Sequence, residues 1–485
     1  MPCIGCKCLL RTLTTILGTV LIVLETMTRG RGGVVIMSVS EGGNMRVIII
    51  GAVAAGTSAA TEIRRNDKEA EIIIYEKDKY ISYAGCGMPY YISNETDNFS
   101  SVVPRDSEFF KEKHDINIYT EHEVLSVNPE NKTLKIKNSS GEITDRYDKL
   151  IIATGAMSVK PDLKGADRDN VFMLRNINDM IQIKNYIQEK KPSSAVIVGS
   201  GFIGLEMCES FKLLGMDVTI IARSKVSKGI DNELSLYIEE HLREKGVNVY
   251  TNTKTVEINS QGVVIGDGSI VKADMVLLAT GAKPNVAIAK NMGVELGVTG
   301  AIKVDKNMKT YIEDVYSCGD CIETYYTINE APVYRPLGST ANKTGTIAGS
   351  NITGIKEEFK GILGTAIYRV FDLTVGMTGL SEEEAIKYGY NVVATTDKRA
   401  NKPEYMGGRP IIIKAVAEKE TGRLLGAQMI GYEGVDRRLD VMAAAITFNA
   451  KAEDLMHLDL AYAPPYSTPR DPLYYTGVKL KAKMN

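Results

Sequence analysis

The sequence has little net charge of either sign, no tryptophan and few histidines. Its 58 basic and 60 acidic residues give a formal net charge of -2, which offers no reason to expect a nucleic acid or an anionic membrane as a partner. The apolar run from Thr12 to Leu24 is too short for a comfortable membrane span. With 44% hydrophobic and 24% charged residues, the composition is that of an ordinary soluble globular protein.

A disulfide framework is also missing. The seven cysteines are odd in number and irregularly spaced, unlike those of a small secreted domain, so a reducing cytoplasm is expected. Residues 1–44 differ from the rest and are expected to be a disordered or mis-assigned extension, with a membrane anchor or signal segment as the weaker alternative. Cys3, Cys6 and Cys8 have no second ligand cluster, and no metal site is predicted.

Two glycine-rich turns each follow a strand-like run and open a helix. The first is Gly51-Ala52-Val53-Ala54-Ala55-Gly56, and the second is Gly199-Ser200-Gly201-Phe202-Ile203-Gly204. Such turns are typical of Rossmann units, because glycine permits the tight turn and the close approach of a pyrophosphate. The first copy is imperfect, since Val53 stands at the middle glycine.

Several residues at strand ends complete two nucleotide sites. Glu76 ends the strand 71–75 and can accept hydrogen bonds from a ribose. The similar segments 150–155 and 276–281 lie at crossovers between the two units, and Asp320 follows a strand where its carboxylate would suit a flavin side-chain hydroxyl. The candidate cofactor-binding residues are Gly51, Val53, Ala54, Ala55, Gly56, Glu76, Lys77, Thr154, Gly155, Gly199, Gly201, Phe202, Ile203, Gly204, Arg223, Gly281, Gly319 and Asp320.

The residues that follow the second strand of the second Rossmann unit indicate whether the protein prefers NADH or NADPH. Ala222 stands there, followed by Arg223. No carboxylate repels a 2′-phosphate and a cation is available, so NADPH is favoured and NADH remains possible.

One cysteine, Cys86, stands between the two turns, flanked by Gly85 and Gly87. A thiolate is the nucleophile of disulfide exchange, and a helix opening at Gly87 would lower the pKa of the thiol. A thiol beside two nucleotide sites indicates that electrons pass from a nicotinamide through a flavin to sulfur. Cys318 and Cys321 have the Cys-x-x-Cys spacing of a redox pair, but we interpret this spacing as coincidental. Cys208 is interpreted as a core residue.

From about Gly361 the pattern changes to an α+β unit without a nucleotide signature. Strands are expected at 365–370, 373–377, 391–395, 410–416 and 424–429, and a helix at 436–449. This unit is expected to serve dimerisation and to close the active site.

These motifs together resemble the pyridine nucleotide–disulfide oxidoreductase family over about residues 45–485. The Cys86 segment is similar to the single-cysteine branch, and the segment 459–467 is similar to coenzyme A-disulfide reductases and related persulfide reductases. Ile81 and Tyr91 leave Cys86 without a Cys-x4-Cys partner, and no histidine precedes a proline. Ala54 replaces the histidine that oxidases and peroxidases of this branch carry, which disfavours oxygen or peroxide as the main oxidant.

The resemblance implies a fold class and a domain order. The fold class is α/β, with two Rossmann-like FAD- and NAD(P)-binding domains plus an α+β C-terminal dimerisation domain. The expected boundaries are 45–156 and 283–357 for the discontinuous FAD-binding domain, 157–282 for the NAD(P)H-binding domain and 358–485 for the dimerisation domain.

The resemblance also implies an activity: FAD-dependent reduction of coenzyme A disulfide by NADPH, through a mixed disulfide between Cys86 and coenzyme A. It implies a homodimer in which Tyr405 and Tyr462 of the partner subunit donate protons, with Tyr466 a close alternative to Tyr462 and interface packing the plainer interpretation of all three. Contacts to coenzyme A would come from Arg64, Arg65 and Ser82, although Arg64 equally suits a solvated helix face.

Other functions remain open at this point. The same thiol and flavin would reduce a persulfide or polysulfide, and an NADH oxidase could act through a sulfenic acid on Cys86. A ferredoxin- or rubredoxin-linked reductase and a catalytically silent flavin scaffold are the remaining alternatives.

Overall fold

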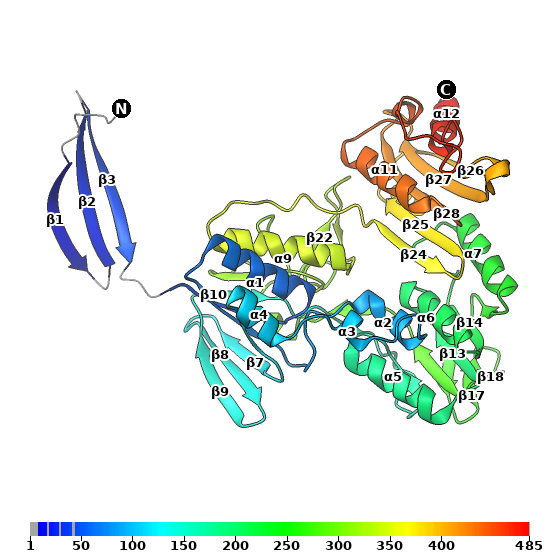
Figure 1. Cartoon of the computed structure of the whole chain (residues 1–485), viewed down its shortest axis with the longest axis horizontal. Coiled ribbons are helices and arrows are strands. Elements are labelled where there is room, and N and C mark those ends of the chain that lie inside the picture. The colour runs from blue at the N-terminus through cyan, green and yellow to red at the C-terminus, as the bar shows by residue number, and fades with distance from the viewer. Residues whose placement is uncertain (1–7, 17–18, 29–30, 41–43, 485) are drawn as a thin grey trace.

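The computed structural model describes residues 8–16, 19–28, 31–40 and 44–484. The first three ranges are antiparallel strands, β1 (Cys8–Ile16), β2 (Thr19–Thr28) and β3 (Arg31–Ser40), drawn in blue in Figure 1. The expectation that residues 1–44 form a disordered or mis-assigned extension stays a prediction. Cys3 and Cys6 lie outside the described residues. Within the described part of the chain, no helix is long and apolar enough to cross a membrane.

The first dinucleotide-binding unit is built on a five-stranded parallel sheet of order β21-β10-β4-β5-β6. Its strands are buried and almost wholly apolar, as expected for a sheet that is covered on both faces. The strands are β21 (Val315–Ser317), β10 (Lys149–Ile152), β4 (Arg46–Ile50), β5 (Glu71–Tyr75) and β6 (Asn117–Tyr119). A smaller antiparallel sheet joins them: β7 (Glu123–Asn128), β8 (Thr133–Asn138) and β9 (Gly141–Arg146).

Two helices pack tightly against each other on this unit: α1 (Ala54–Asn66) and α9 (Gly338–Ile352), shown side by side in Figure 1. A Cβ on Gly345 would lie 2.3 Å from the carbonyl oxygen of Ala55. Glycine is therefore required there for the backbones to approach. This contact brings a segment near residue 340 beside the first glycine turn.

The second dinucleotide-binding unit repeats the arrangement with a parallel sheet of order β12-β19-β13-β14-β15. Its strands are β12 (Val171–Phe172), β19 (Met275–Leu278), β13 (Ser194–Val198), β14 (Asp217–Ile221) and β15 (Asn248–Tyr250). Its helices are α5 (Ile177–Lys190), α6 (Phe202–Leu213) and α7 (Asn232–Glu244). An antiparallel sheet completes it, with β16 (Thr255–Ile258), β17 (Gly262–Ile265) and β18 (Ile270–Lys272).

The two units are joined by a pair of short strands. β11 (Ala156–Ser158) pairs antiparallel with β20 (Ala282–Pro284). These strands directly follow the similar segments 150–155 and 276–281, so the chain leaves and re-enters the first unit at one place. The domain boundaries inferred from the sequence stay a prediction.

The C-terminal unit is an antiparallel sheet of order β24-β25-β28-β27-β26. The strands are β24 (Ala366–Val370), β25 (Leu373–Gly379), β28 (Leu424–Gly431), β27 (Pro410–Glu418) and β26 (Val392–Ala400). Its helices are α10 (Glu382–Lys387), α11 (Val435–Thr447) and α12 (Pro472–Met484). The predicted strands and the helix near 436–449 are confirmed.

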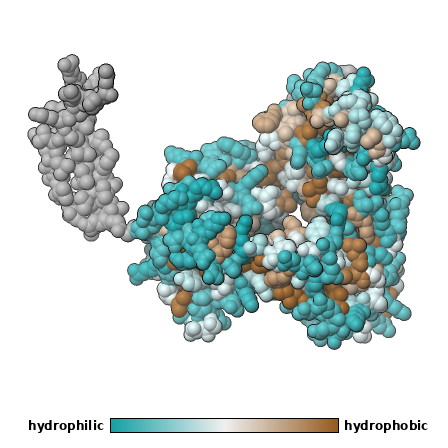
Figure 2. All heavy atoms as spheres, in the orientation of Figure 1, coloured by the Kyte–Doolittle hydropathy of each residue, from teal (hydrophilic) through white to brown (hydrophobic). Residues whose placement is uncertain are grey.

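Short helices connect these units: α2 (Met88–Ile92), α3 (Phe99–Val102), α4 (Ser107–His114) and α8 (Ala287–Asn291). Figure 2 shows hydrophilic residues over much of the outer surface and hydrophobic residues gathered on the side where the units face one another. One apolar cluster includes residues of all three units, among them Met88, Phe211 and Val375. The region around α2 is therefore held by all three units.

Candidate active site

The first glycine turn forms a cradle at the start of α1. Gly51 has a φ of +109°, and a Cβ there would lie 2.3 Å from the carbonyl oxygen of Ala153. Val53 takes the N-cap position but its side chain caps no amide. The helix therefore presents free N–H groups and its positive dipole end to the turn, as a phosphate site requires. Val53 at the middle position does not prevent this geometry.

Glu76 lies directly beside this turn, at the end of β5. Its carboxylate accepts hydrogen bonds from the N–H groups of Ala52 (2.8 Å) and Asp78 (3.0 Å). The side chain is buried, and burial raises its pKa above the ordinary value of 4.5. Lys77 is exposed next to it. An acceptor at this strand end suits a ribose hydroxyl.

Gly319 and Asp320 reach the same place from β21. The Gly319 N–H donates to Thr344 Oγ1 (3.0 Å), and a Cβ on Gly319 would lie 2.6 Å from that of Ala55. Arg175 of the second unit donates to the Asp320 carboxylate (2.8 Å) and to the carbonyl oxygen of Ala156 (3.0 Å). Sequence reasoning missed Arg175, because no motif marks it. Thr154 and Gly155 follow the end of β10, and the Thr154 hydroxyl donates to the carbonyl oxygen of Asn285 (2.6 Å).

The second glycine turn has the same construction. Gly199 has a φ of +111°, and a Cβ there would lie 2.2 Å from Ala279 O. Gly201 is the N-cap of α6, which Phe202 and Ile203 open. Phe202 lies against Tyr368 of the C-terminal unit, with ring centroids 4.8 Å apart. The remaining predicted residues of this site are Gly204 on α6 and Gly281, which follows β19.

Arg223 lies where the sequence predicted it, directly after β14. Ala222 is buried, whereas Arg223 and Ser224 are exposed. The guanidinium is therefore free to meet a phosphate from solvent.

Cys86 is an exposed thiol in a single helical turn, Gly85–Gly87, and α2 begins at Met88. The helix expected after Cys86 is confirmed, but the expected lowering of the thiol pKa is wrong. The pKa of Cys86 is raised, first by removal of water from the thiolate and then by the carboxylates of Glu206 and Asp320, with Arg175 opposing. A helix as short as Met88–Ile92 does not outweigh these effects.

Glu206 is a second residue that sequence reasoning missed. It lies on α6, shortly after the glycine turn, and faces the neighbourhood of Cys86. Burial, with a contribution from Glu209, raises its pKa to about 7. The sequence did contain a signal for Glu206, because an acidic residue is present within the first two turns of the helix that follows the second glycine turn.

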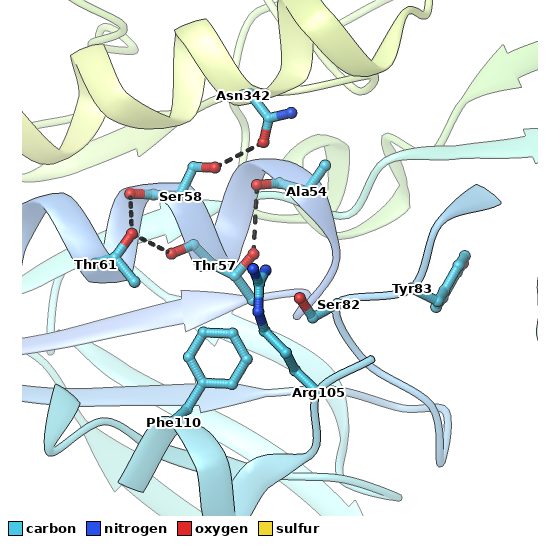
Figure 3. Close-up of a pocket in the computed structure, with 9 residues that line it drawn as sticks. All are labelled: Ala54, Thr57, Ser58, Thr61, Ser82, Tyr83, Arg105, Phe110 and Asn342. Carbon is cyan, nitrogen blue, oxygen red and sulfur yellow. Dashed lines mark hydrogen bonds between the residues drawn. The ribbon is translucent and has the colours of Figure 1, made fainter. Parts of the chain in front are cut away.

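A pocket of about 230 Å³ opens along α1. Figure 3 shows Ser58 and Thr61 of α1 facing it, Ser82 at one end and Arg105 with Phe110 closing another side. The Ser58 hydroxyl donates to Asn342 Oδ1 of α9 (2.8 Å). Ser82 was predicted to bind substrate, whereas Arg105 was not.

A second pocket of about 440 Å³ shares Thr61 with the first and is lined by Arg64, Arg65, Lys68 and Lys113. The Arg64 guanidinium donates to the backbone carbonyl groups of Lys68 (2.6 Å) and Ala70 (2.7 Å) and to those of residues 114 and 115. Its donors are thus engaged in holding the fold. The side chain of Arg65 is 68% exposed and pairs with Glu62. Of the two predicted arginines, Arg65 is the one available to a ligand.

The three candidate tyrosines lie on the C-terminal unit and not on the unit that carries Cys86. Tyr405, Tyr462 and Tyr466 are 76%, 49% and 69% exposed. Tyr405 sits in the short helix Glu404–Met406 between β26 and β27. Three exposed tyrosines on one unit fit an interface with another molecule.

Three further cysteines are packed in the interior of residues 44–484. Cys208, Cys318 and Cys321 are free and buried. The Cys321 sulfur contacts Ser317 Oγ (3.4 Å) and Cys318 O (3.2 Å). Among residues 44–484 no group of three or more metal-ligating side chains is present.

Comparison with known proteins gives matches over nearly the whole of residues 45–471. A family model described as pyridine nucleotide-disulphide oxidoreductase matches residues 45–335, and a model of the dimerisation domain of such proteins matches residues 365–471. The NAD(P)H sulfur oxidoreductase (CoA-dependent) of Pyrococcus furiosus is 39% identical, covering 90% of this chain and 99% of the relative. The coenzyme A disulfide reductase of Staphylococcus epidermidis is 33% identical, with the same coverage.

Solved structures show the same fold. An NAD-dependent persulfide reductase from A. fulgidus is 38% identical with a TM-score of 0.88, over 90% of this chain and 83% of that one. An engineered water-forming NADPH oxidase bound to NADPH is 25% identical with a TM-score of 0.86, over 91% and 99%. Its parent, the NADH oxidase of Lactobacillus brevis, was solved with NADH. The engineered form carries Ala-Arg-Ser in place of a consecutive Asp-Ala-Met, among other substitutions.

Proposed function

Because this chain belongs to the pyridine nucleotide-disulphide oxidoreductase family, we propose that it passes electrons from NADPH through FAD and Cys86 to coenzyme A disulfide. The chain is an NAD(P)H-dependent flavoprotein oxidoreductase. The substrate class is inferred from one observation: among residues 44–484, Cys86 is the exposed thiol near the flavin-binding cradle, whereas Cys208, Cys318 and Cys321 are buried. A lone thiol needs a small-molecule sulfur to complete its redox pair.

The residues present fit FAD. The first turn packs so closely that a Cβ on Gly51 would collide with the carbonyl oxygen of Ala153, and Glu76, Gly319 and Asp320 surround the start of α1. Bound FAD would supply the acceptance of hydride from NADPH and the delivery of an electron pair to sulfur. Residues of this chain would bind the pyrophosphate with the α1 amides, the ribose with Glu76 and the ribityl hydroxyls with Asp320.

The chemistry at Cys86 is disulfide exchange. The Cys86 thiolate attacks one sulfur of the substrate, the substrate S–S bond breaks and one coenzyme A thiolate leaves. Delivery of two electrons then cleaves the Cys86–S–S–CoA bond and frees the second thiolate. Overall, one NADPH and one proton convert the disulfide into two thiols.

The pockets along α1 support coenzyme A as the leaving group. They run from Ser82, close to Cys86 in the chain, past Thr61 to Arg65 and Lys113. Arg105, Arg65 and Lys113 offer cations to the phosphates of an extended nucleotide. Arg64 is not assigned this role, because backbone carbonyl groups occupy its donors.

NADPH is the proposed electron donor. Ala222-Arg223-Ser224 directly follows β14, and the NADPH-bound engineered oxidase gained the same three residues in the same order. An exposed guanidinium without a neighbouring carboxylate at this strand end suits a 2′-phosphate. NADH would bind without that ion pair.

The homodimer is the proposed working form, in which Tyr405 and Tyr462, or Tyr466 in its place, protonate the leaving thiolates at Cys86 of the other subunit. Exposure of these phenols on the unit that matches a dimerisation domain supports this role. A phenol is an adequate proton donor to a thiolate. The cytoplasmic location stays a prediction from cysteine content.

A persulfide or polysulfide is the second candidate substrate, because the exposed lone thiol serves that reaction equally and several relatives are named for it. Reduction of oxygen by an NADH oxidase mechanism is less favoured, since Ala54 and not histidine opens α1.

The test is anaerobic oxidation of NADPH with coenzyme A disulfide as the only acceptor, using wild type and Cys86→Ser. Rapid turnover in wild type and its loss in the variant are expected. Pantethine, a disulfide without the nucleotide, is the matched substrate: Arg65→Ala should raise KM for coenzyme A disulfide but not for pantethine. Absence of turnover with coenzyme A disulfide, together with turnover of coenzyme A persulfide, would transfer the assignment to the second candidate.

A further inference from the structure

Arg438 of α11 is the largest side chain buried in the molecule, with 1% of its surface exposed. Its guanidinium donates to the Asp471 carboxylate, with Nε 3.0 Å from Oδ1 and Nη2 2.9 Å from Oδ2. It also donates to the carbonyl oxygen of Gly434 (2.9 Å) and to that of Asn401 (3.0 Å). A further contact of 3.3 Å joins Nη2 to Ser467 Oγ.

Two of these partners belong to the segment that carries Tyr462 and Tyr466. Ser467 directly follows Tyr466, and its hydroxyl donates to Asp471 Oδ2 (2.8 Å). Asp471 also accepts from the N–H of Leu473 (3.0 Å) at the start of α12. Arg438 and Asp471 thus fix the end of this segment to two helices.

The third partner, Asn401, belongs to the segment that carries Tyr405. Asn401 follows β26, and its backbone N–H donates to Arg409 O (2.9 Å) while its side-chain oxygen accepts from the Arg409 N–H (2.8 Å). These two bonds close the loop 402–408 at its base. Asn401 is itself buried, so its carbonyl group needs the bond from Arg438.

We propose that Arg438 is a positioning residue that holds the Tyr405 loop and the Tyr462–Tyr466 segment in one fixed arrangement, so that their phenols reach the partner subunit's thiol together. This inference rests on the proposed role of the tyrosines. A guanidinium suits the task, because its planar fork presents several donors in fixed directions. One group contacts backbone or side chain of both segments, so displacing it releases both.

A structural role alone explains the contacts less well. Buried ion pairs contribute little net stability, because desolvation offsets their attraction, and apolar residues often replace them without loss. Here four of the five donor contacts of Arg438 go to the two tyrosine-bearing segments and not to the sheet. Proton donation requires hydrogen-bond reach of about 3 Å, so small loop displacements would be costly.

The experiment compares Arg438→Gln with wild type in the full-length, flavin-loaded enzyme. We expect kcat with coenzyme A disulfide to fall about 10- to 100-fold, which is the cost of an ångström-scale misplacement. The rate at which NADPH reduces the flavin should stay within about twofold, since that step does not use the tyrosines. Arg438→Lys should restore part of kcat by keeping the charge.

The decisive measurement is a mutant cycle with Tyr405→Phe and Tyr462→Phe. If Arg438 acts through the phenols, Arg438→Gln adds no further loss to the double tyrosine variant. An additional loss of the same size in that background overturns the proposal. If the two tyrosine variants keep the kcat of wild type, the tyrosines are not the proton donors and that part of the proposed function is wrong.

Controls separate positioning from unfolding. Met442→Ala truncates a fully buried side chain of the same helix that forms none of the hydrogen bonds described above, and it should lower the melting temperature without changing kcat. Should Arg438→Gln fail to fold, Ser467→Ala removes the hydroxyl contact while leaving the ion pair with Asp471 intact. An unchanged kcat in a folded Ser467→Ala, together with a kcat loss in Met442→Ala, would refute the inference.

Discussion

Glu206 gives the sharpest prediction, because its protonation couples the stability of the fold to the chemistry at Cys86. Burial raises the pKa of its carboxyl from 4.5 to about 7. Between these two values the folded protein keeps the proton that the unfolded chain releases. Stability is therefore lost as the pH rises from about 4.5 to about 7, and the full loss corresponds to about 3 kcal/mol.

Glu206→Gln removes this effect, because the amide stays neutral at every pH. At pH 5 the variant should match wild type to within about 1 kcal/mol, whereas at pH 8 it should be more stable by about 3 kcal/mol. Urea unfolding at the two pH values measures this difference. Glu240→Gln on α7, where the carboxylate is exposed, is the matched control and should change stability little at either pH.

The same substitution should make the thiol of Cys86 more acidic. The Glu206 carboxylate is one cause of the raised pKa of Cys86, so its removal should move the pH dependence of iodoacetamide alkylation to lower pH. A stability gain that is equal at pH 5 and pH 8, or an alkylation profile that does not move, would refute the reasoning.

Three further predictions concern the cofactor sites and the joint between units. Gly345→Ala should lose bound flavin, measured by the ratio of visible to ultraviolet absorbance, because its Cβ would lie 2.3 Å from Ala55 O. Ala222→Asp should raise KM for NADPH about tenfold or more relative to NADH, since a carboxylate would repel the 2′-phosphate. Lys414→Met should lower the free energy of unfolding in urea by about 3–5 kcal/mol, because Lys414 and Asp231 form a buried pair 3.1 Å apart and the Asp231 carboxylate would lose its cation, keeping only hydrogen bonds from neutral groups such as Gln428.

Each of these has an outcome that would contradict it. Gly338→Ala opens the same helix with free space around it, so equal flavin loss in both glycine variants would argue against the helix contact as the cause. If Ala222→Asp keeps the preference for NADPH, the residues that follow β14 do not select for the 2′-phosphate. Lys387→Met, at an exposed position on α10, should have little effect, and an equal effect would show that burial of the pair is not the cause.

The sequence by itself determined the two strand-glycine-helix units, the isolated thiol at Cys86 with a helix after it, and the strands of the C-terminal unit. These features depend on local rules: apolar strands, glycines at fixed spacing and turn residues. It also located Glu76, Asp320 and Arg223, since each lies within a few residues of the end of a strand that is easy to recognise.

Only the tertiary structure decided which charges act on which groups. The pKa of Cys86 is raised and not lowered, first because the fold removes water from the thiolate and then because the carboxylates of Glu206 and Asp320 lie near it. From the sequence, Arg64 suited a coenzyme A contact and a solvated helix face equally, yet its guanidinium donates to the backbone carbonyl groups of residues 114 and 115. Arg438 bonds to both Asn401 and Ser467, which are separated in the chain by more than half of the C-terminal unit. Such contacts join residues far apart in the chain, and no local pattern records them.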